Sequence, residues 1–285
     1  MSNRPMTLRQ QIVTQASLAL AGLFVVVPIL WMIRLAFDGT IAAKPEDAAL
    51  LPHQWTLANF ARAWISPIAN YSFAHLLGNS LLVAVSTALL ALVFGTTTAY
   101  AFARYRFPGR RAGLFAVLAL LTLPPAGLMA PYFIFMISLG LRGSLLGLVF
   151  VYSAIAVPFA VWTVRNAVQG IPLEQEQAAM LEGATRLRVF AQITLPQIAP
   201  AVAVAGFIAF ILAWSEFALG WGLISDPNRL TLAMALYTMR GSFANVSWGL
   251  MSATALMLAL PVLALCYLLG RYLLSGLSLG AASEG

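Results

Sequence analysis

A polar segment over residues 170–196 holds the side chains best suited to a specific interaction, and it lies between two long apolar runs. Pro172 fixes a backbone φ that suits the first turn of a helix. Glu174 and Glu176 would lie near the positive N-terminal end of that helix. Gly183 can adopt the left-handed conformation that ends it. The segment therefore predicts a short acidic helix followed by a turn.

The chemistry of this helix is that of protein docking. Ala178 and Ala179 add almost no side-chain bulk, so a partner surface can approach the backbone, and Leu181 supplies an apolar anchor. Glu176 can pair with an arginine of that partner. The alternative is an interfacial connector that binds lipid headgroups, but such a helix is usually rich in Lys and Arg, and this one is acidic. The pattern indicates a plug for a cleft on another protein.

Catalytic chemistry has little support elsewhere in the sequence. A phosphate-binding loop needs a lysine after a glycine, and Lys44, the one lysine of the chain, does not follow one. His53 and His75 lack partners at metal-ligand spacing, and Cys266 stands alone. We therefore expect no enzyme activity, no metal and no cofactor in this chain, and no ATP hydrolysis by a Walker-type loop.

The elements that must hold the polar segment are membrane helices. The chain is 61% hydrophobic and 9% charged, with a mean hydropathy of +0.88, which leaves too little polar surface for a soluble globule. Five apolar runs of about 20 residues, and a sixth broken by prolines, are long enough to cross about 30 Å of hydrocarbon. We predict an all-α integral membrane protein with a single transmembrane domain over residues 1–285. Its six transmembrane helices are expected at about 12–37, 74–103, 112–137, 145–168, 197–222 and 246–272, with the docking loop at 170–196.

Basic residues set the predicted orientation, because Lys and Arg favour the cytoplasmic side of a membrane. They precede the first span, crowd the connection between the second and third spans, and flank the polar segment. Both termini and the polar segment are thus expected to be cytoplasmic in a multi-pass inner-membrane protein. This placement accounts for most of the net charge of +7, so nucleic acid is not expected as a partner.

Three further segments carry structural signals. Pro124, Pro125 and Pro131 interrupt the third span and predict a kinked helix that faces a cavity or is buried in protein. Small residues in the second span, such as Gly95 and Ala99, predict close helix packing. The loop over residues 38–73 is expected to form an ordered extracytoplasmic cap.

The spacing within the polar segment matches a family pattern. Gln177 stands where that pattern has Glu, and it is followed at the family's spacing by Ala178, Ala179, Gly183, Ile193, Leu195 and Pro196. The segments 99–110, 214–217 and 271–281 also match. The sequence resembles the membrane permeases of binding-protein-dependent ABC importers, in the carbohydrate-uptake, maltose-type branch, over nearly the whole chain.

This resemblance implies a function and a set of partners. The chain would form half of the translocation pathway for a sugar or oligosaccharide and would work by alternating access as a heterodimer with a companion permease. Two ATP-binding cassette ATPase subunits would bind ATP and Mg²⁺. An extracytoplasmic solute-binding protein would deliver the solute, and membrane lipid would surround the spans.

Candidate site residues fall into three groups. The ATPase-docking loop would use Glu174, Glu176, Gln177, Ala178, Ala179, Leu181, Gly183, Ile193, Leu195 and Pro196. Solute contacts in the pathway are expected from Asn79, Tyr152, Trp214 and Glu216, although these residue types also serve as contacts between helices or as anchors at the membrane interface. The third group is an outer segment that would contact the binding protein, and its alternative role is an ordinary turn between spans. Its residues are Arg240, Gly241, Ser242, Phe243 and Asn245.

Other functions stay open from the sequence. A permease for glycerol phosphate or another polar solute would favour an added arginine in the pathway, and Arg34, Arg142 and Arg240 all lie on the predicted outer side. An ion-coupled carrier would need ionisable groups within its spans, and Glu216 is the main candidate. A membrane scaffold without transport activity would not require the docking spacing.

Overall fold

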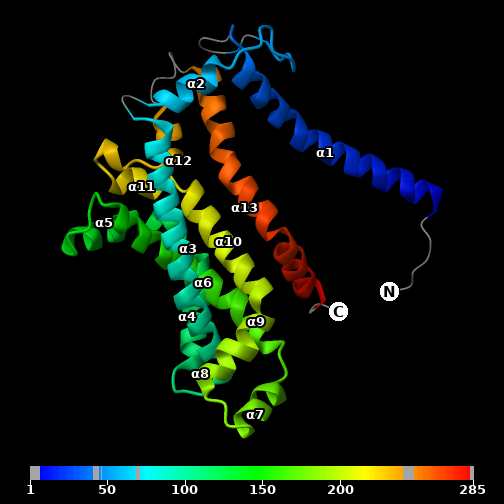
Figure 1. The fold of residues 1–285 in the computed structure, drawn as a ribbon, viewed down its shortest axis with the longest axis vertical. Helices are drawn as coiled ribbons and strands as arrows, with labels where there is room; N and C mark the ends of the chain where they lie inside the picture. Colours follow the sequence, from blue (N-terminus) through cyan, green and yellow to red (C-terminus); the bar gives the residue numbers. More distant parts are fainter. Residues whose placement is uncertain (1–6, 41–44, 46, 69–70, 240–246, 283–285) are drawn as a thin grey trace. The chain divides into compact units, whose positions relative to one another are not determined.

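The computed structural model describes residues 7–40, 45, 47–68, 71–239 and 247–282. These residues are almost entirely helical, with two isolated β-bridges, Asp38 with Trp55 and Ile68 with Tyr71 (Figure 1). The chain divides into two compact units: unit 1 is Met1–Phe73 with Thr238–Met257, and unit 2 is Ala74–Tyr237 with Leu258–Gly285. The helices are α1 (Leu8–Phe37), α2 (Ala58–Ile65), α3 (Phe73–Arg104), α4 (Arg110–Thr122), η1 (Pro125–Leu128), α5 (Met129–Ser138), α6 (Leu145–Gln169), α7 (Leu173–Leu181), α8 (Arg186–Val189), η2 (Phe190–Thr194), α9 (Leu195–Gln197), α10 (Ala199–Ser215), α11 (Ala218–Leu223), η3 (Pro227–Arg229), α12 (Leu232–Met239) and α13 (Trp248–Ala282).

Four of these helices, α1, α3, α6 and α13, are long and apolar enough to cross a membrane. Two bent pairs of helices raise the number to as many as six if each pair counts as one span. The first pair runs from α4 through η1 to α5 and bends by 102°, and the second runs from α8 to α10 and bends by 78°. The predicted all-helical membrane fold is confirmed, and the count of exactly six spans stays a prediction.

The third predicted span breaks at its prolines. α4 ends at Thr122, Leu123 and Pro124 have extended backbones, and Pro125 begins η1. A proline ring disfavours helical conformation in the residue before it, which explains why the chain leaves the helix here. Pro131 lies in the first turn of α5, where its missing N–H needs no helical partner. The predicted interruption is confirmed, and it is sharper than a kink.

The fifth span was predicted as one helix over 197–222, but the structure divides this segment into separate helices. α10 ends at Ser215 because Glu216 has an extended backbone, with ψ of 129°, and the separate helix α11 follows. The apolar pattern continues across this break, so hydropathy alone could not reveal it.

The core of unit 2 forms where α3, α6 and α10 meet through small side chains. A Cβ atom added at Gly95 of α3 would lie 2.5 Å from the Cβ of Ala160 of α6, so only glycine permits this approach. Ala99, Ala160 and Ala205 are buried in the same cluster. The predicted close packing of the second span is therefore confirmed.

In unit 1, charged side chains around the buried Arg34 and Asp38 hold the loop after α1. Arg34 forms ion pairs with Asp38 at 3.5 Å and with Asp47 at 2.7 Å. Burial raises the pKa of Asp38, but hydrogen bonds from Thr40 and from the backbone N–H of His53, with the Arg34 charge, outweigh burial and lower that pKa to about 2. The described part of the 38–73 loop is thus ordered by its own polar contacts.

Candidate functional site

The predicted docking helix is α7, which follows α6 directly and lies beside α8 within unit 2 (Figure 1). Pro172 occupies the N-cap position, and Glu174 and Glu176 lie in the first turn of α7. Carboxylates at this end interact favourably with the helix dipole. The predicted short acidic helix is confirmed, whereas its role in coupling stays a prediction.

The turn that ends α7 depends on Gly183. Its φ is +89°, in the left-handed region that side chains other than glycine's rarely adopt. The Gly183 N–H donates to the Met180 carbonyl at 3.1 Å, and the Ala184 N–H donates to the Ala179 carbonyl at 3.0 Å. These two bonds form a Schellman motif, which confirms the predicted glycine turn.

Glu176 points inward and anchors α7 to the rest of unit 2. It is 2% exposed, and its Oε1 accepts hydrogen bonds from Arg104 Nε and Thr194 Oγ1, each at 2.9 Å. Its Oε2 accepts from the Tyr100 hydroxyl at 3.1 Å, and Arg104 also donates to the Ile171 carbonyl. The expectation that Glu176 faces a partner's arginine is therefore corrected. Glu176 pairs instead with Arg104 of this chain. A buried carboxylate is costly without an opposite charge nearby, and Arg104 supplies that charge.

The exposed side of the loop presents what we call the docking surface: Gln177, Ala178, Leu181 and Leu187. Leu181 is 90% exposed and Leu187, on α8, is 75% exposed. Sequence reasoning missed Leu187, although an apolar residue between two arginines in a polar loop was an available signal. Glu174 and Pro196 are also exposed, whereas Ala179, Ile193 and Leu195 are half-buried, and Leu195 packs against the core cluster of unit 2. Apolar side chains this exposed in a polar loop suit insertion into a partner's cleft.

A hollow of about 270 Å³ lies beside the docking surface, between the end of α3 and α8. Tyr105 and Leu187 are among the residues that line it, and the Arg186 guanidinium lies 5.4 Å from the centre of the Tyr105 ring. A cation placed over an aromatic face is held there without an acid partner. The docking surface therefore has both a projecting apolar side chain and an adjacent recess.

The expected pathway residues Tyr152 and Glu216 meet in the structure. The Tyr152 hydroxyl donates to Glu216 Oε2 at 2.6 Å. The same carboxylate accepts the backbone N–H groups of Leu219 at 2.9 Å and Gly220 at 3.2 Å, so it caps the start of α11. Both carboxylate oxygens are therefore engaged by the chain itself.

The two other expected pathway residues are also engaged within unit 2. Trp214 is 3% exposed and stacks on Phe210 at 5.4 Å, so its ring offers no open face to a solute in this conformation. Asn79 donates to the carbonyls of Asn228 and Leu230, each at 2.9 Å, and ties the start of α3 to the segment at η3. Trp214 and Asn79 thus serve as contacts between segments of unit 2, which was the alternative to a contact with solute. The candidate binding-protein residues, Arg240, Gly241, Ser242, Phe243 and Asn245, lie outside the described residues.

An exposed aromatic group lies next to Glu216 along the chain. Phe217 stacks on Tyr237 with ring centres 4.7 Å apart, and Trp221 meets Tyr237 edge-on at 6.0 Å. All three side chains are exposed. No local pattern in the sequence predicts this group, because its members come together only where α11 and α12 meet across the intervening η3 segment.

The fold and the site define a class: an integral membrane protein with a short acidic helix, α7, between two apolar helices. Residues 91–275 match the family model described as the inner-membrane component of binding-protein-dependent transport systems. The chain belongs to this family of transport permeases, so it is a multi-pass inner-membrane protein. The expected family resemblance is confirmed.

Known proteins of this kind match the chain over most of its length. The diacetylchitobiose uptake system permease protein NgcG of Streptomyces coelicolor is 31% identical over 272 residues, which cover 94% of this chain and 87% of that protein. The trehalose transport system permease protein SugB of Mycobacterium tuberculosis is 29% identical, over 90% of this chain and 92% of its own. A solved bacterial ABC transporter that imports alginate shares the fold, with a TM-score of 0.79 at 20% identity, over 95% of this chain and 100% of the compared chain.

Proposed function

We propose that this permease forms half of the pathway of an ABC importer for a sugar or oligosaccharide. Family membership supports the transport role, and the relatives named for diacetylchitobiose and trehalose uptake support a carbohydrate. The observation that carries the coupling part of the proposal is the docking surface, held outward on a helix that Glu176 and Gly183 fix in place.

The proposed partners are a companion permease in a heterodimer, two ATPase subunits, a solute-binding protein and the surrounding lipid. The docking surface enters a cleft on the ATPase, which alone binds ATP and Mg²⁺, so this chain needs no cofactor. Both termini and α7 face the cytoplasm, and the segment with Arg240 and Phe243 meets the binding protein. The two units act together as one permease domain.

For the solute contact we propose the group of Phe217, Trp221 and Tyr237. Exposed aromatic faces can cover the apolar face of a sugar ring, whereas the buried rings of Tyr152 and Trp214 cannot do so in this conformation. Glu216 would then act indirectly, because it fixes the start of the helix that carries Trp221.

The alternative within the same class is a permease for glycerol phosphate or another polar solute. Arg142 is exposed, but its guanidinium already lies 4.7 Å from the centre of the Phe133 ring. An ion-coupled carrier is a weaker alternative, since Glu216 accepts three hydrogen bonds from the chain itself.

The test is solute-stimulated ATP hydrolysis by the complete complex in proteoliposomes, with its own binding protein. The panel is diacetylchitobiose, trehalose, maltose and glycerol 3-phosphate. We expect a neutral saccharide to stimulate hydrolysis and uptake. Stimulation by glycerol 3-phosphate alone would establish the alternative, and uptake that ignores ATP but stops with a protonophore would establish an ion-coupled carrier.

A further inference from the structure

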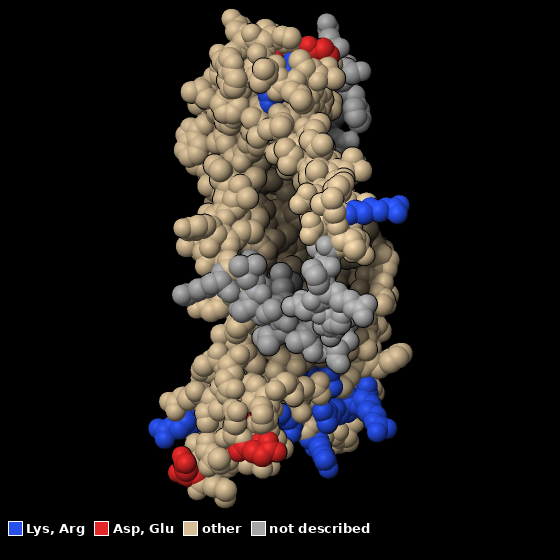
Figure 2. All heavy atoms as spheres, turned by 90° about the vertical axis from the view of Figure 1, so that its right-hand side faces the viewer, with Lys and Arg blue, Asp and Glu red and all other residues tan. Residues whose placement is uncertain are grey.

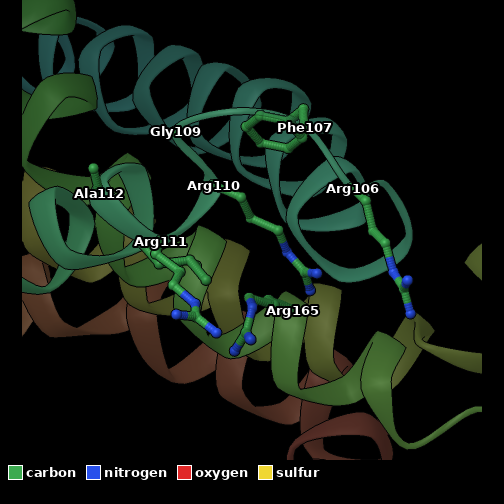
Figure 3. Close-up of a pocket in the computed structure, with 8 residues that line it drawn as sticks. Arg106, Phe107, Gly109, Arg110, Arg111, Ala112 and Arg165 are labelled. Atoms are coloured by element: carbon green, nitrogen blue, oxygen red, sulfur yellow. The ribbon is translucent and has the colours of Figure 1, made fainter.

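A cavity of about 630 Å³ in unit 2 is lined by four arginines. Arg106, Arg110 and Arg111 come from the turn before α4 and from its first residues, and Arg165 comes from the last turns of α6. Figure 3 shows the side chains of Arg110, Arg111 and Arg165 extending from α4 and α6 into the same region. α4 packs on α6, so this arrangement belongs to the packed part of unit 2.

Within the described part of the chain, this group of arginines has no acidic partner. Among the described residues, no carboxylate lies within 4.0 Å of any of the four arginines. Arg110 Nε donates to the Phe102 carbonyl at 2.9 Å, but Arg165 Nε is buried without a hydrogen-bond partner in the described structure. A buried guanidinium N–H left unpaired is costly, so this position favours a ligand that accepts hydrogen bonds and carries negative charge.

The backbone adds positive potential at the same place. The first turn of α4 holds Arg110 and Arg111 and no acidic residue, and Gly109 before it provides no side-chain cap. Cations are unfavourable at a helix N-terminus, where the dipole is positive. An anion between these arginines would satisfy both the side chains and the helix end.

The surface beside the cavity is apolar. Phe115 lies four residues after Arg111, and Leu118 lies three residues after Phe115, which places all three on one face of α4. Phe115 is 75% exposed and Leu118 is also exposed. A basic site that continues into an exposed apolar helix face matches an amphiphile, whereas free phosphate or an acidic peptide would make no use of the apolar part.

We propose that this cavity binds the phosphate headgroup of an anionic phospholipid, with its acyl chains along the α4 face. Figure 2 shows Arg side chains gathered at the lower end of the face in view, where Asp or Glu side chains also lie. The site is separate from the docking surface, and it depends on the membrane setting of α4 and α6 but not on which solute is carried.

The experiment uses the full-length chain purified in a nonionic detergent and native mass spectrometry. The probes are phosphatidylglycerol, phosphatidylcholine with the same acyl chains, and inorganic phosphate as a competitor. The test variant is Arg110→Gln with Arg165→Gln. The matched control is Arg9→Gln with Arg188→Gln, which removes the same charge from two exposed arginines outside the cavity.

We expect the wild-type chain to prefer phosphatidylglycerol, with affinity falling about fivefold for each cavity arginine removed, because a basic residue near anionic lipid contributes about that factor. The control should keep the preference, and excess inorganic phosphate should not displace the lipid. The proposal is overturned if the wild-type chain binds both lipids equally, which would leave the cavity to an acidic partner protein. It is equally overturned if the control loses as much affinity as the test variant, if the test variant keeps the preference, or if inorganic phosphate displaces the lipid. If the double variant fails to fold, equal binding of both lipids by the wild-type chain, or displacement of the lipid by inorganic phosphate, still overturns the proposal.

Discussion

Unit 2 contains two carboxylates that accept a hydrogen bond from a tyrosine, and they are stabilised in different ways. Glu176 has the charge of Arg104 at 2.9 Å, with Tyr100 and Thr194 as further donors. Glu216 has Tyr152 and two backbone N–H groups, and no cation of the described chain lies within 4.0 Å of it. The first joins α7 to α3 and η2, and the second sets the break between α10 and α11. One therefore positions the docking surface, and the other shapes the end of a span next to the exposed aromatic group.

Because Glu176 is paired with a cation and Glu216 is not, we expect substitution of Glu176 to destabilise the protein more than substitution of Glu216. Removing one member of a buried ion pair leaves the other unpaired and typically costs 3 kcal/mol or more, whereas losing a hydrogen bond to a charged group costs about 1.5–3 kcal/mol. Disturbance at Glu176 should thus appear as lost assembly, and disturbance at Glu216 as lost transport in an assembled complex.

The largest effect is expected from Glu176→Lys. It places a second cation against Arg104 in a buried site, so α7 should detach from α3, at a cost of about 3 kcal/mol or more. Co-purification of the ATPase with the permeases should then be lost. Glu174→Lys is the matched control, because Glu174 is exposed in the same turn of α7. If both variants lost the same amount of ATPase, the ion pair with Arg104 would not be what positions α7.

A smaller effect is expected from Glu216→Ala. The change uncaps α11 and leaves the buried Tyr152 hydroxyl without its acceptor, at a cost of about 2 kcal/mol. The complex should still assemble, but uptake into proteoliposomes should fall. Tyr152→Phe should have part of this effect, since it removes one of the three hydrogen bonds. Wild-type uptake by an assembled Glu216→Ala complex would contradict the role given to this carboxylate.

Gly183→Val should weaken docking more mildly. A β-branched residue at φ +89° is strained by about 1–2 kcal/mol, and an added Cβ meets no atom within 4 Å, so backbone strain is the whole effect within the chain. Gly140→Val is the control, because Gly140 has φ +67° and equally open surroundings but lies in the turn between α5 and α6. Solute-stimulated ATP hydrolysis should fall only in the Gly183 variant, and an equal fall in both would point to general instability.

Gln177→Glu should have the smallest effect. Gln177 is exposed at the middle of α7, beyond the first turn, so an added negative charge there changes the stability of the helix little. ATPase stimulation should be unchanged or higher, measured beside Gln177→Ala. A marked loss on Gln177→Glu would show that the partner surface rejects negative charge at this point.

Local signals in the sequence predicted much of this arrangement. The lengths of the apolar runs predicted the long helices, Pro124 and Pro125 predicted the broken third span, and Pro172 with Gly183 predicted the limits of α7. Each of these depends on neighbouring residues alone, which is why it could be read from the chain.

The contacts that give the sites their character could not be read in this way. Arg104 and Glu176 are 72 residues apart, and Tyr152 and Glu216 are 64 apart, so their pairing depends on how α3, α6 and α10 pack. Glu216 looked like a pathway residue because a carboxylate in an apolar run is costly. The structure gives a second reason for a carboxylate at this position, because Glu216 caps the start of α11. No pattern of hydropathy could predict that contact.

The central claim is that Leu181 enters a cleft of the ATPase. The direct measurement replaces Leu181 with a photo-crosslinking amino acid in the complete complex, and compares it with the same replacement at Leu139, an exposed residue in the turn after α5. The account predicts a covalent adduct between the permease and the ATPase from position 181 and none from position 139. No adduct from position 181, or equal adducts from both positions, would contradict it.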